Sequence, residues 1–170
     1  LTSDDLRRTA SFLNSVGSDG QFRYLPHETR AQASRAMLAA GLLSQQYVGW
    51  KSDRPEVVAG ITKLIATLPK WETEDRNVYE WYYTSQLLHH NAVATPNARQ
   101  WRNELVRQII ANQETTHGLK GSWYPADITA AQSDMAHVGG RLYVTAMCVL
   151  ILETQSRYLP RFADDVPDAE

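Results

Sequence analysis

The sequence contains a single cysteine, Cys148, among its 170 residues, and this scarcity excludes a disulfide-stabilised scaffold. An excess of one charge is also missing, because 17 lysines and arginines face 19 aspartates and glutamates. The balance gives no basic surplus of the kind that nucleic-acid binding uses, so no nucleic-acid partner is expected. The longest nearly continuous apolar run, Leu142 to Leu152, is shorter than the roughly 20 residues of a membrane-spanning helix, so no membrane span is expected in this segment.

The composition is that of one globular domain, with 43% hydrophobic and 21% charged residues. A chain of this length buries enough surface to fold without a metal or crosslinks. We expect one domain over residues 1–163 and a disordered acidic tail over residues 164–170, which hold four acids. The chain begins with Leu1 rather than Met, and no targeting segment is visible, which suggests an excised domain and leaves the compartment open.

Clusters of glycine and proline divide the chain into six segments with helical periodicity. Amphipathic segments with one apolar side alternate with segments that are apolar almost all round, and this alternation occurs three times. It predicts an all-α domain in which outer helices pair with enclosed inner helices. The segments cover residues 3–16, 28–48, 55–68, 75–90, 97–113 and 140–158.

Two of the expected connections share a pattern of glycine, a large aromatic residue and a nearby proline. The first contains Gly20, Phe22 and Pro26, and the second contains Gly121, Trp123 and Pro125. Glycine permits unusual backbone angles, and an aromatic ring is large enough to fill the end of a helix pair. We therefore expect both rings to be buried between helices.

The paired segments resemble the α/α-toroid superfamily of terpenoid cyclases such as squalene-hopene cyclases, protein prenyltransferase β subunits and complement-like thioester domains. Gln113 followed by Gly121-Ser122-Trp123 is similar to the glutamine-tryptophan repeat of the cyclases. Segments 75–90 and 139–146 resemble bacterial proteins with prenyltransferase and squalene-oxidase-like repeats. The resemblance implies a partial α/α toroid of about six helices in three outer/inner pairs. It also implies further helical repeats of a parent polypeptide, or a homodimer partner, to complete the ring.

The catalytic signatures of these enzymes are missing from the sequence. There is no Asp-x-Asp-Asp acid motif and no Gly-Cys-Gly-Glu-Gln thioester run. Cys148 lies in an apolar segment without the Asp-x-Cys arrangement of the prenyltransferase zinc site, so it is expected to be a core residue. No metal and no cofactor are expected.

A polar and aromatic stripe in segment 75–90 is the main candidate for ligand binding. Its residues follow the spacing i, i+3, i+4, i+7 and i+11, which places them on one helix face. An aromatic wall with a few hydrogen-bonding groups suits an apolar or ring-shaped ligand. The alternative is that the tyrosines pack between helices with their hydroxyls satisfied. The stripe comprises Tyr79, Tyr82, Tyr83, Gln86 and His90, to which the charged helix start adds Asp75 and Arg76.

A second cluster is the candidate for catalysis. In the resembling enzymes the active site lies where inner helices begin, so Asp134, His137 and Arg141 would converge there with Glu28 and Asp75 and could transfer a proton. The alternative is that these residues cap helices and pair with one another. The leading hypothesis is a non-catalytic repeat domain that binds a protein partner or an apolar ligand on a concave, aromatic-lined face. The alternative function is a fragment of a terpenoid-cyclase-like or glycan-lyase-like α/α-barrel enzyme.

Overall fold

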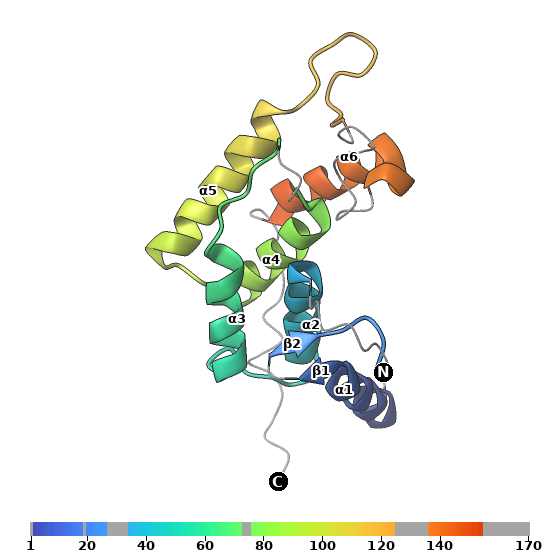
Figure 1. Ribbon diagram of the computed structural model, residues 1–170, viewed down its shortest axis with the longest axis vertical. Helices are drawn as coiled ribbons and strands as arrows, with labels where there is room; N and C mark the ends of the chain where they lie inside the picture. The colour runs from blue at the N-terminus through green and yellow to red at the C-terminus, as the bar shows by residue number, and fades with distance from the viewer. Residues whose placement is uncertain (1, 19, 27–33, 73–75, 125–135, 155–170) are drawn as a thin grey trace.

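The computed structural model describes residues 2–18, 20–26, 34–72, 76–124 and 136–154, and within them the protein is built almost entirely from six α-helices (Figure 1). This confirms the all-α prediction. A short antiparallel pair, β1 with β2, differs from the expectation of no strands. The elements are α1 (Ser3–Val16), β1 (Gly17–Ser18), β2 (Gln21–Phe22), α2 (Arg35–Tyr47), α3 (Pro55–Ile65), α4 (Val78–His90), α5 (Pro96–Ala111) and α6 (Ala136–Thr154).

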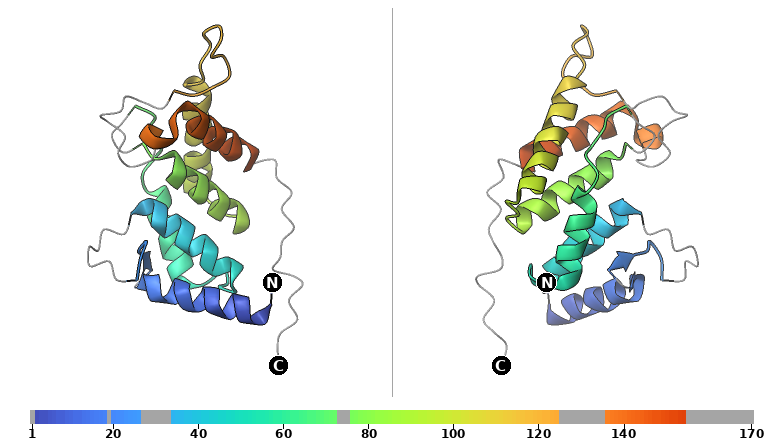
Figure 2. Two further views of the ribbon diagram at one scale, coloured as in Figure 1. Left: turned by 90° about the vertical axis from the view of Figure 1, so that its right-hand side faces the viewer. Right: turned by 60° about the vertical axis from the view of Figure 1, so that its left-hand side comes forward.

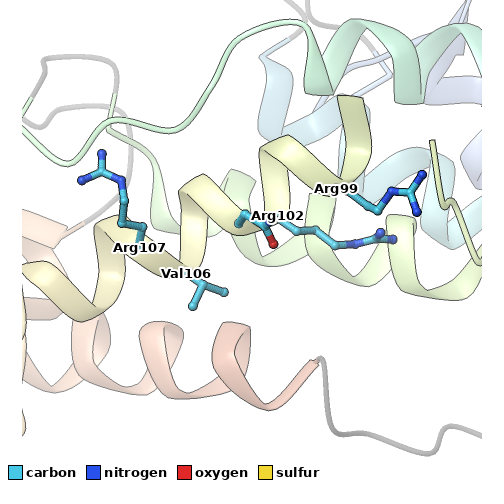
Figure 3. Close-up of a pocket in the computed structure, with 5 residues that line it drawn as sticks. Arg99, Arg102, Val106 and Arg107 are labelled. Carbon is cyan, nitrogen blue, oxygen red and sulfur yellow. The ribbon is translucent and has the colours of Figure 1, made fainter. Parts of the chain in front are cut away.

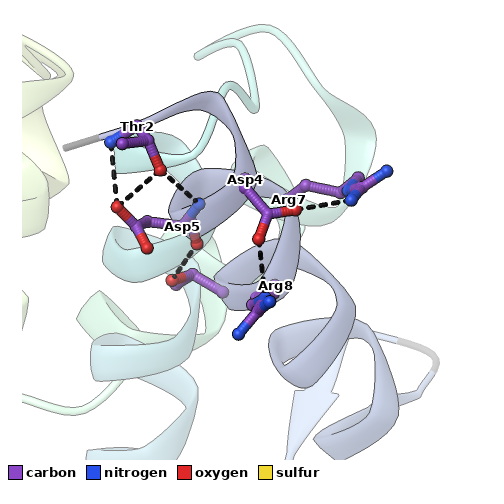
Figure 4. A network of polar contacts seen from close by, with 6 residues as sticks. Thr2, Asp4, Asp5, Arg7 and Arg8 are labelled. Carbon is purple, nitrogen blue, oxygen red and sulfur yellow. Dashed lines mark hydrogen bonds and ion pairs between the residues drawn. The ribbon is translucent and has the colours of Figure 1, made fainter.

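Side-chain caps fix where the helices begin. In α1, the Thr2 hydroxyl accepts from the Asp5 amide at 3.2 Å, while the Asp5 carboxylate accepts from the Thr2 amide at 2.9 Å (Figure 4). The bond from the Thr2 amide, followed by one from the Thr2 hydroxyl to the same carboxylate, lowers the pKa of Asp5 below its ordinary value. The neighbouring Asp4 forms ion pairs with Arg7 and Arg8 on the next turn. Such capping satisfies amides that have no partner within the helix, and the same role falls to Ser34, Asn77 and Thr95 at the starts of α2, α4 and α5.

A row of three helices forms the centre of the molecule. Helix α4 packs against α2 on one side and α6 on the other, and α1 packs against α2 at the end of the row (Figure 2). Helices α3 and α5 contact each other and both contact α4, so they cover one face of the row. Helix α4 is therefore surrounded by α2, α3, α5 and α6, as predicted for an inner helix, whereas α6, also predicted as an inner helix, packs chiefly against α4.

The connections between helices bury large aromatic rings, as the two glycine-containing patterns predict. Phe22 in β2 and Trp123 after α5 are each 2% exposed. The Trp123 indole donates to the Ile109 carbonyl oxygen at 2.7 Å. Phe22 packs so closely on α2 that a Cβ added to Gly41 would lie 2.2 Å from its ring. Trp71 is buried in the connection between α3 and α4, so three connections each bury a large aromatic ring.

Helix α6 contains a break and is only partly enclosed. Gly140 adopts φ 62° and ψ −159° within it. Cys148 is fully buried, which confirms the predicted core role, while Leu142 is 82% exposed. By length and composition alone, this 19-residue helix, with a mean hydropathy of 1.2, could cross a membrane. The expectation of no membrane span rested only on the apolar run from Leu142 to Leu152. Core helices of soluble proteins share this property, and we assign no membrane role to it.

Candidate functional site

Helix α4 carries its tyrosines on the side that α3 and α5 leave uncovered. Trp81 is 4% exposed and contacts the Trp71 ring in the α3–α4 connection, with centroids 6.2 Å apart. Successive helical residues are rotated by about 100°, so Tyr79 and Tyr83 lie about 160° from Trp81 around the helix axis. Tyr79, Tyr82, Tyr83 and His90 are all half-buried. The predicted stripe therefore exists, and its rings remain partly accessible.

The three tyrosine rings of this stripe contact one another, and His90 contacts a ring of α2. The Tyr83 ring lies 4.7 Å from Tyr79 and 5.1 Å from Tyr82, measured between centroids. At the other end of the stripe, His90 meets Tyr47 of α2 with centroids 5.5 Å apart. Tyr47 is 54% exposed. We call Tyr47, Tyr79, Tyr82, Tyr83 and His90 together the aromatic face.

Three titratable groups of the aromatic face have pKa values shifted toward their neutral forms. Burial, followed by a hydrogen bond with Tyr79, raises the pKa of Tyr83 to about 12. Burial, followed by the influence of Tyr82, raises the pKa of Tyr47. Burial, followed by the neighbouring His89, lowers the pKa of His90 below its usual value. These three groups are therefore uncharged at pH 7, and the face they form suits an uncharged group.

Polar contacts at both ends join the two helices that carry the aromatic face. At one end, the amides of Gln46 and Asn91 donate to each other at 2.7 and 2.8 Å. At the other end, Arg35 forms an ion pair with Glu80 at 2.8 Å and donates to the Leu64 carbonyl oxygen at 2.6 Å. These contacts fix the two helices that carry the rings relative to each other at both ends.

Gln86 occupies the middle of the predicted stripe but serves a different purpose. It is 5% exposed, and its side-chain amide donates to the Thr154 hydroxyl of α6 at 3.0 Å. The Thr154 hydroxyl in turn donates to the Leu150 carbonyl oxygen. Gln86 therefore links α4 to α6.

Of the two charged residues predicted to extend the stripe at the start of α4, Arg76 is buried in a connection between helices. Arg76 is 1% exposed, lies over the Trp71 ring at 4.9 Å and donates to the Tyr124 carbonyl oxygen at 3.4 Å. Its surroundings are those of a residue that holds a connection together. Asp75, a predicted ligand-binding residue, lies outside the described residues.

The catalytic candidates are not joined in the described part of the chain. His137 is exposed, and Arg141 donates to the Ser122 hydroxyl at 2.8 Å and lies over the Tyr124 ring. No hydrogen bond or ion pair links His137 to Arg141 there, and Asp134 and Glu28 lie outside the described residues. The described residues hold no group of three histidine, cysteine or acidic side chains that could bind a metal ion. Acid/base chemistry at this cluster stays a prediction.

Two features of the site were missed by sequence reasoning. The first is Tyr47, which belongs to a partly exposed face of α2 with Met37, Ala40 and Ser44. Their spacing of three and four residues could have revealed this face. The second is a cavity of about 460 Å³ where α2 and α4 begin, lined in part by Arg35, Glu80, Trp81 and Trp101.

Comparison with known proteins returns no match. No protein-family model matches the chain, no curated protein matches its sequence, and no solved structure matches its fold. The relation to the α/α toroids therefore stays an expectation based on the residues quoted above.

Proposed function

We propose that this domain is a non-catalytic segment of an α/α toroid that binds a protein partner or an apolar ligand through the aromatic face. The ligand would place an uncharged ring or apolar group on the rings of Tyr47, Tyr82 and Tyr83. The observation that supports this proposal is the presence of two groups of contacting, partly accessible rings on two helices that are fixed to each other at both ends. One group is Tyr79, Tyr82 and Tyr83 on α4, and the other is the pair of Tyr47 and His90 between α2 and α4.

The degree of exposure favours binding over simple packing. Leu87 and Leu88, on other sides of α4, are completely buried, as expected for side chains that only fill the core. Tyr82 and Tyr83 between them keep part of their surface accessible, and Tyr47 keeps more than half. Aromatic pairs contribute about 0.5–1.5 kcal/mol beyond the burial of area, so an incoming ring gains from each ring that it contacts.

The test uses two probes that separate the two kinds of ligand. Nile red, an uncharged dye, represents small apolar ligands, and an oligoproline peptide represents a protein segment, since extended proline-rich segments dock on aromatic-lined grooves. Each is titrated into the full chain and into the Tyr47→Ala and Tyr82→Ala variants. We expect one probe to bind and its affinity to fall about tenfold in either variant, in line with the loss of a ring contact.

A matched control separates specific binding from general stickiness. Tyr24 is 71% exposed, lies in the segment after β2 and is not part of the aromatic face, so Tyr24→Ala should bind the probe as the unmodified chain does. Circular dichroism and a thermal melt establish that each variant is folded. The proposal is wrong if folded Tyr47→Ala and Tyr82→Ala proteins bind both probes unchanged, or if neither probe binds the full chain. Unfolding of Tyr82→Ala together with unaltered binding by folded Tyr47→Ala would assign the rings to the core.

A further inference from the structure

Helix α5, which carries no residue of the aromatic face, provides the lining of a cavity of about 530 Å³ (Figure 3). The lining residues follow the spacing i, i+3, i+4, i+7 and i+8, which places them along one side of the helix. Three of them are arginines and none is acidic. They are Arg99, Arg102, Asn103, Val106 and Arg107. This composition makes the cavity a candidate for binding an anion.

Arg99 and Arg102 provide two positive charges at one end of the cavity. They are three positions apart and therefore neighbours on the helix surface. Figure 3 shows their side chains extending in the same direction, away from Arg107. Arg107 forms an ion pair with Glu104, which neutralises its charge, whereas no acidic side chain pairs with Arg99 or Arg102 within the described residues. Two like charges thus share this end of the cavity without a counter-charge, an arrangement that an anion would stabilise.

Arg102 is held in position by the backbone rather than by an acid. Its guanidinium donates to the Val93 carbonyl oxygen at 2.6 Å and to the Leu88 carbonyl oxygen at 3.0 Å. These oxygens orient the group without cancelling its charge, and the guanidinium keeps further N–H donors for a ligand. Burial lowers the pKa of Arg102, although an arginine stays charged at neutral pH. A charge that has lost part of its hydration gains more from an approaching anion than a fully hydrated charge does.

The start of α5 adds to the positive potential around Arg99. This arginine is the fourth residue of the helix, whose first turn contains no acidic side chain, whereas the first turns of α1, α3 and α4 contain acids. The amino end of a helix carries a partial positive charge, which favours a nearby anion. Arg99 is exposed, and within the described residues it has no hydrogen bond and no ion pair, so its guanidinium is available to a ligand.

A phosphoryl dianion matches this pair of arginines better than a carboxylate does. A carboxylate has one charge and two oxygens, which a single arginine satisfies in a bidentate pair. A phosphate monoester carries about −1.5 to −2 charges at pH 7 and three strong acceptor oxygens, so it can engage two guanidinium groups and an amide at once. The cavity also has the size of small-molecule sites, roughly 300–1,000 Å³, which leaves room for an organic group beside the phosphate.

We propose that the α5 cavity binds a phosphoryl dianion between Arg99 and Arg102, with the side-chain amide of Asn103 as an additional donor. The dianion is supplied either by inorganic phosphate or by a small phosphate monoester. Since every residue of the lining belongs to α5, this site does not depend on the aromatic face or on the function proposed for it.

Calorimetric titration of the full chain with three probes tests the ligand chemistry. The probes are inorganic phosphate, butyl phosphate and pentanoate, which has the same butyl chain but ends in a carboxylate. None of them has a ring that could stack on the aromatic face. We expect the tighter-binding phosphate to bind at least about tenfold more tightly than pentanoate, because it contacts a second guanidinium.

The two phosphates distinguish the source of the dianion. Tighter binding of butyl phosphate than of inorganic phosphate assigns the site to a monoester, and any other order assigns it to free phosphate. Binding should weaken as salt is raised, since the arginines lie near the surface. The proposal is overturned if neither phosphate binds, or if pentanoate binds as tightly as the phosphates do.

Three variants locate the binding site. Arg99→Ala should weaken phosphate binding about tenfold, and it leaves the bonds of Arg102 to the two carbonyl oxygens intact. Arg99→Lys keeps the charge and should recover part of the loss. Arg8→Ala changes the net charge by the same amount on α1 and should bind as the unmodified chain does. With all variants shown to be folded by a thermal melt, unchanged binding by Arg99→Ala, or equal weakening by Arg8→Ala, overturns the proposal.

Discussion

Tyr47 of α2 and His90 of α4 meet edge to face, with ring centroids 5.5 Å apart and planes inclined by 68°. The contact lies beside the Gln46–Asn91 pair, so ring packing and amide hydrogen bonds join the same two helix ends. Edge-to-face packing is a favoured arrangement of aromatic side chains. The position of His90 against Tyr47 links the charge state of the histidine to the integrity of the aromatic face.

Stability should depend on the protonation of His90. Burial and the neighbouring His89 lower the pKa of His90 in the folded chain, whereas in the unfolded chain it titrates near 6.5. Between these two values the unfolded state binds more protons, so the free energy of unfolding should decrease as pH falls below about 6.5. Urea unfolding at pH 7.5 and pH 5.5 measures this, and His90→Gln should reduce the difference. An equal pH dependence in the variant would contradict the assignment.

Tyr83 should produce an effect at the alkaline end. Its pKa is raised to about 12 in the folded chain, while an unfolded tyrosine titrates near 10. The unfolded state loses its proton first, so the contribution of Tyr83 to stability is complete below pH 10 and is lost as pH rises toward 12. Ultraviolet difference titration should show a tyrosine that ionises near pH 12, and Tyr83→Phe should remove that step while the raised pKa of Tyr47 remains. If the late step persists in the variant, the late-ionising group is a different tyrosine.

Removing one side of the Gln46–Asn91 pair should destabilise the fold. Gln46 is 7% exposed, and Gln46→Ala removes the donor to the side-chain oxygen of Asn91, while the Asn91 side-chain nitrogen keeps its bond to the Leu87 carbonyl oxygen. A polar group left without a partner costs about 1–3 kcal/mol of unfolding free energy. Chemical denaturation measures the change, and Gln21→Ala, at an exposed position in β2, is the control. A double variant with Asn91→Ala should lose less than the sum of the two single changes.

The parts of the fold that could be predicted are those that depend on residues close together in the sequence. The period of apolar residues gave the bounds of α1 as the structure has them, from Ser3 to Val16. The strands β1 and β2 were missed because two residues are too few for an alternating pattern. The burial of Cys148 could be predicted because its neighbours in the sequence are apolar, as expected in a helix that is enclosed by others.

The site was predicted less completely, because it depends on contacts between distant residues. The spacing on α4 identified its tyrosines, yet it could not show that Gln86 is bound to Thr154, 68 residues further along the chain. Tyr47 was missed since α2 is rich in apolar residues on every side, which conceals its one partly exposed face. Both errors have the same physical origin: helix period reports which residues share a face, and only tertiary packing decides what that face meets.

Gly41 should tolerate no larger residue. Its position against the Phe22 ring leaves no space for a Cβ, so Gly41→Ala must displace the ring or the helix. Overpacking of this kind costs about 1–3 kcal/mol. A thermal melt should show a lower midpoint for Gly41→Ala, and combining it with Phe22→Leu should recover part of the loss. Ser44→Ala, at a half-buried position one turn further along α2, is the control and should change the midpoint little.

One side of α6 exposes large aliphatic side chains. Leu142 is 82% exposed and Val149 is 41% exposed, seven residues apart and thus on one flank of the helix. Both side chains belong to the helix that packs on α4 from the side opposite α2. Polar substitutions at Leu142 and Val149 therefore leave the interior between α2 and α4 unchanged.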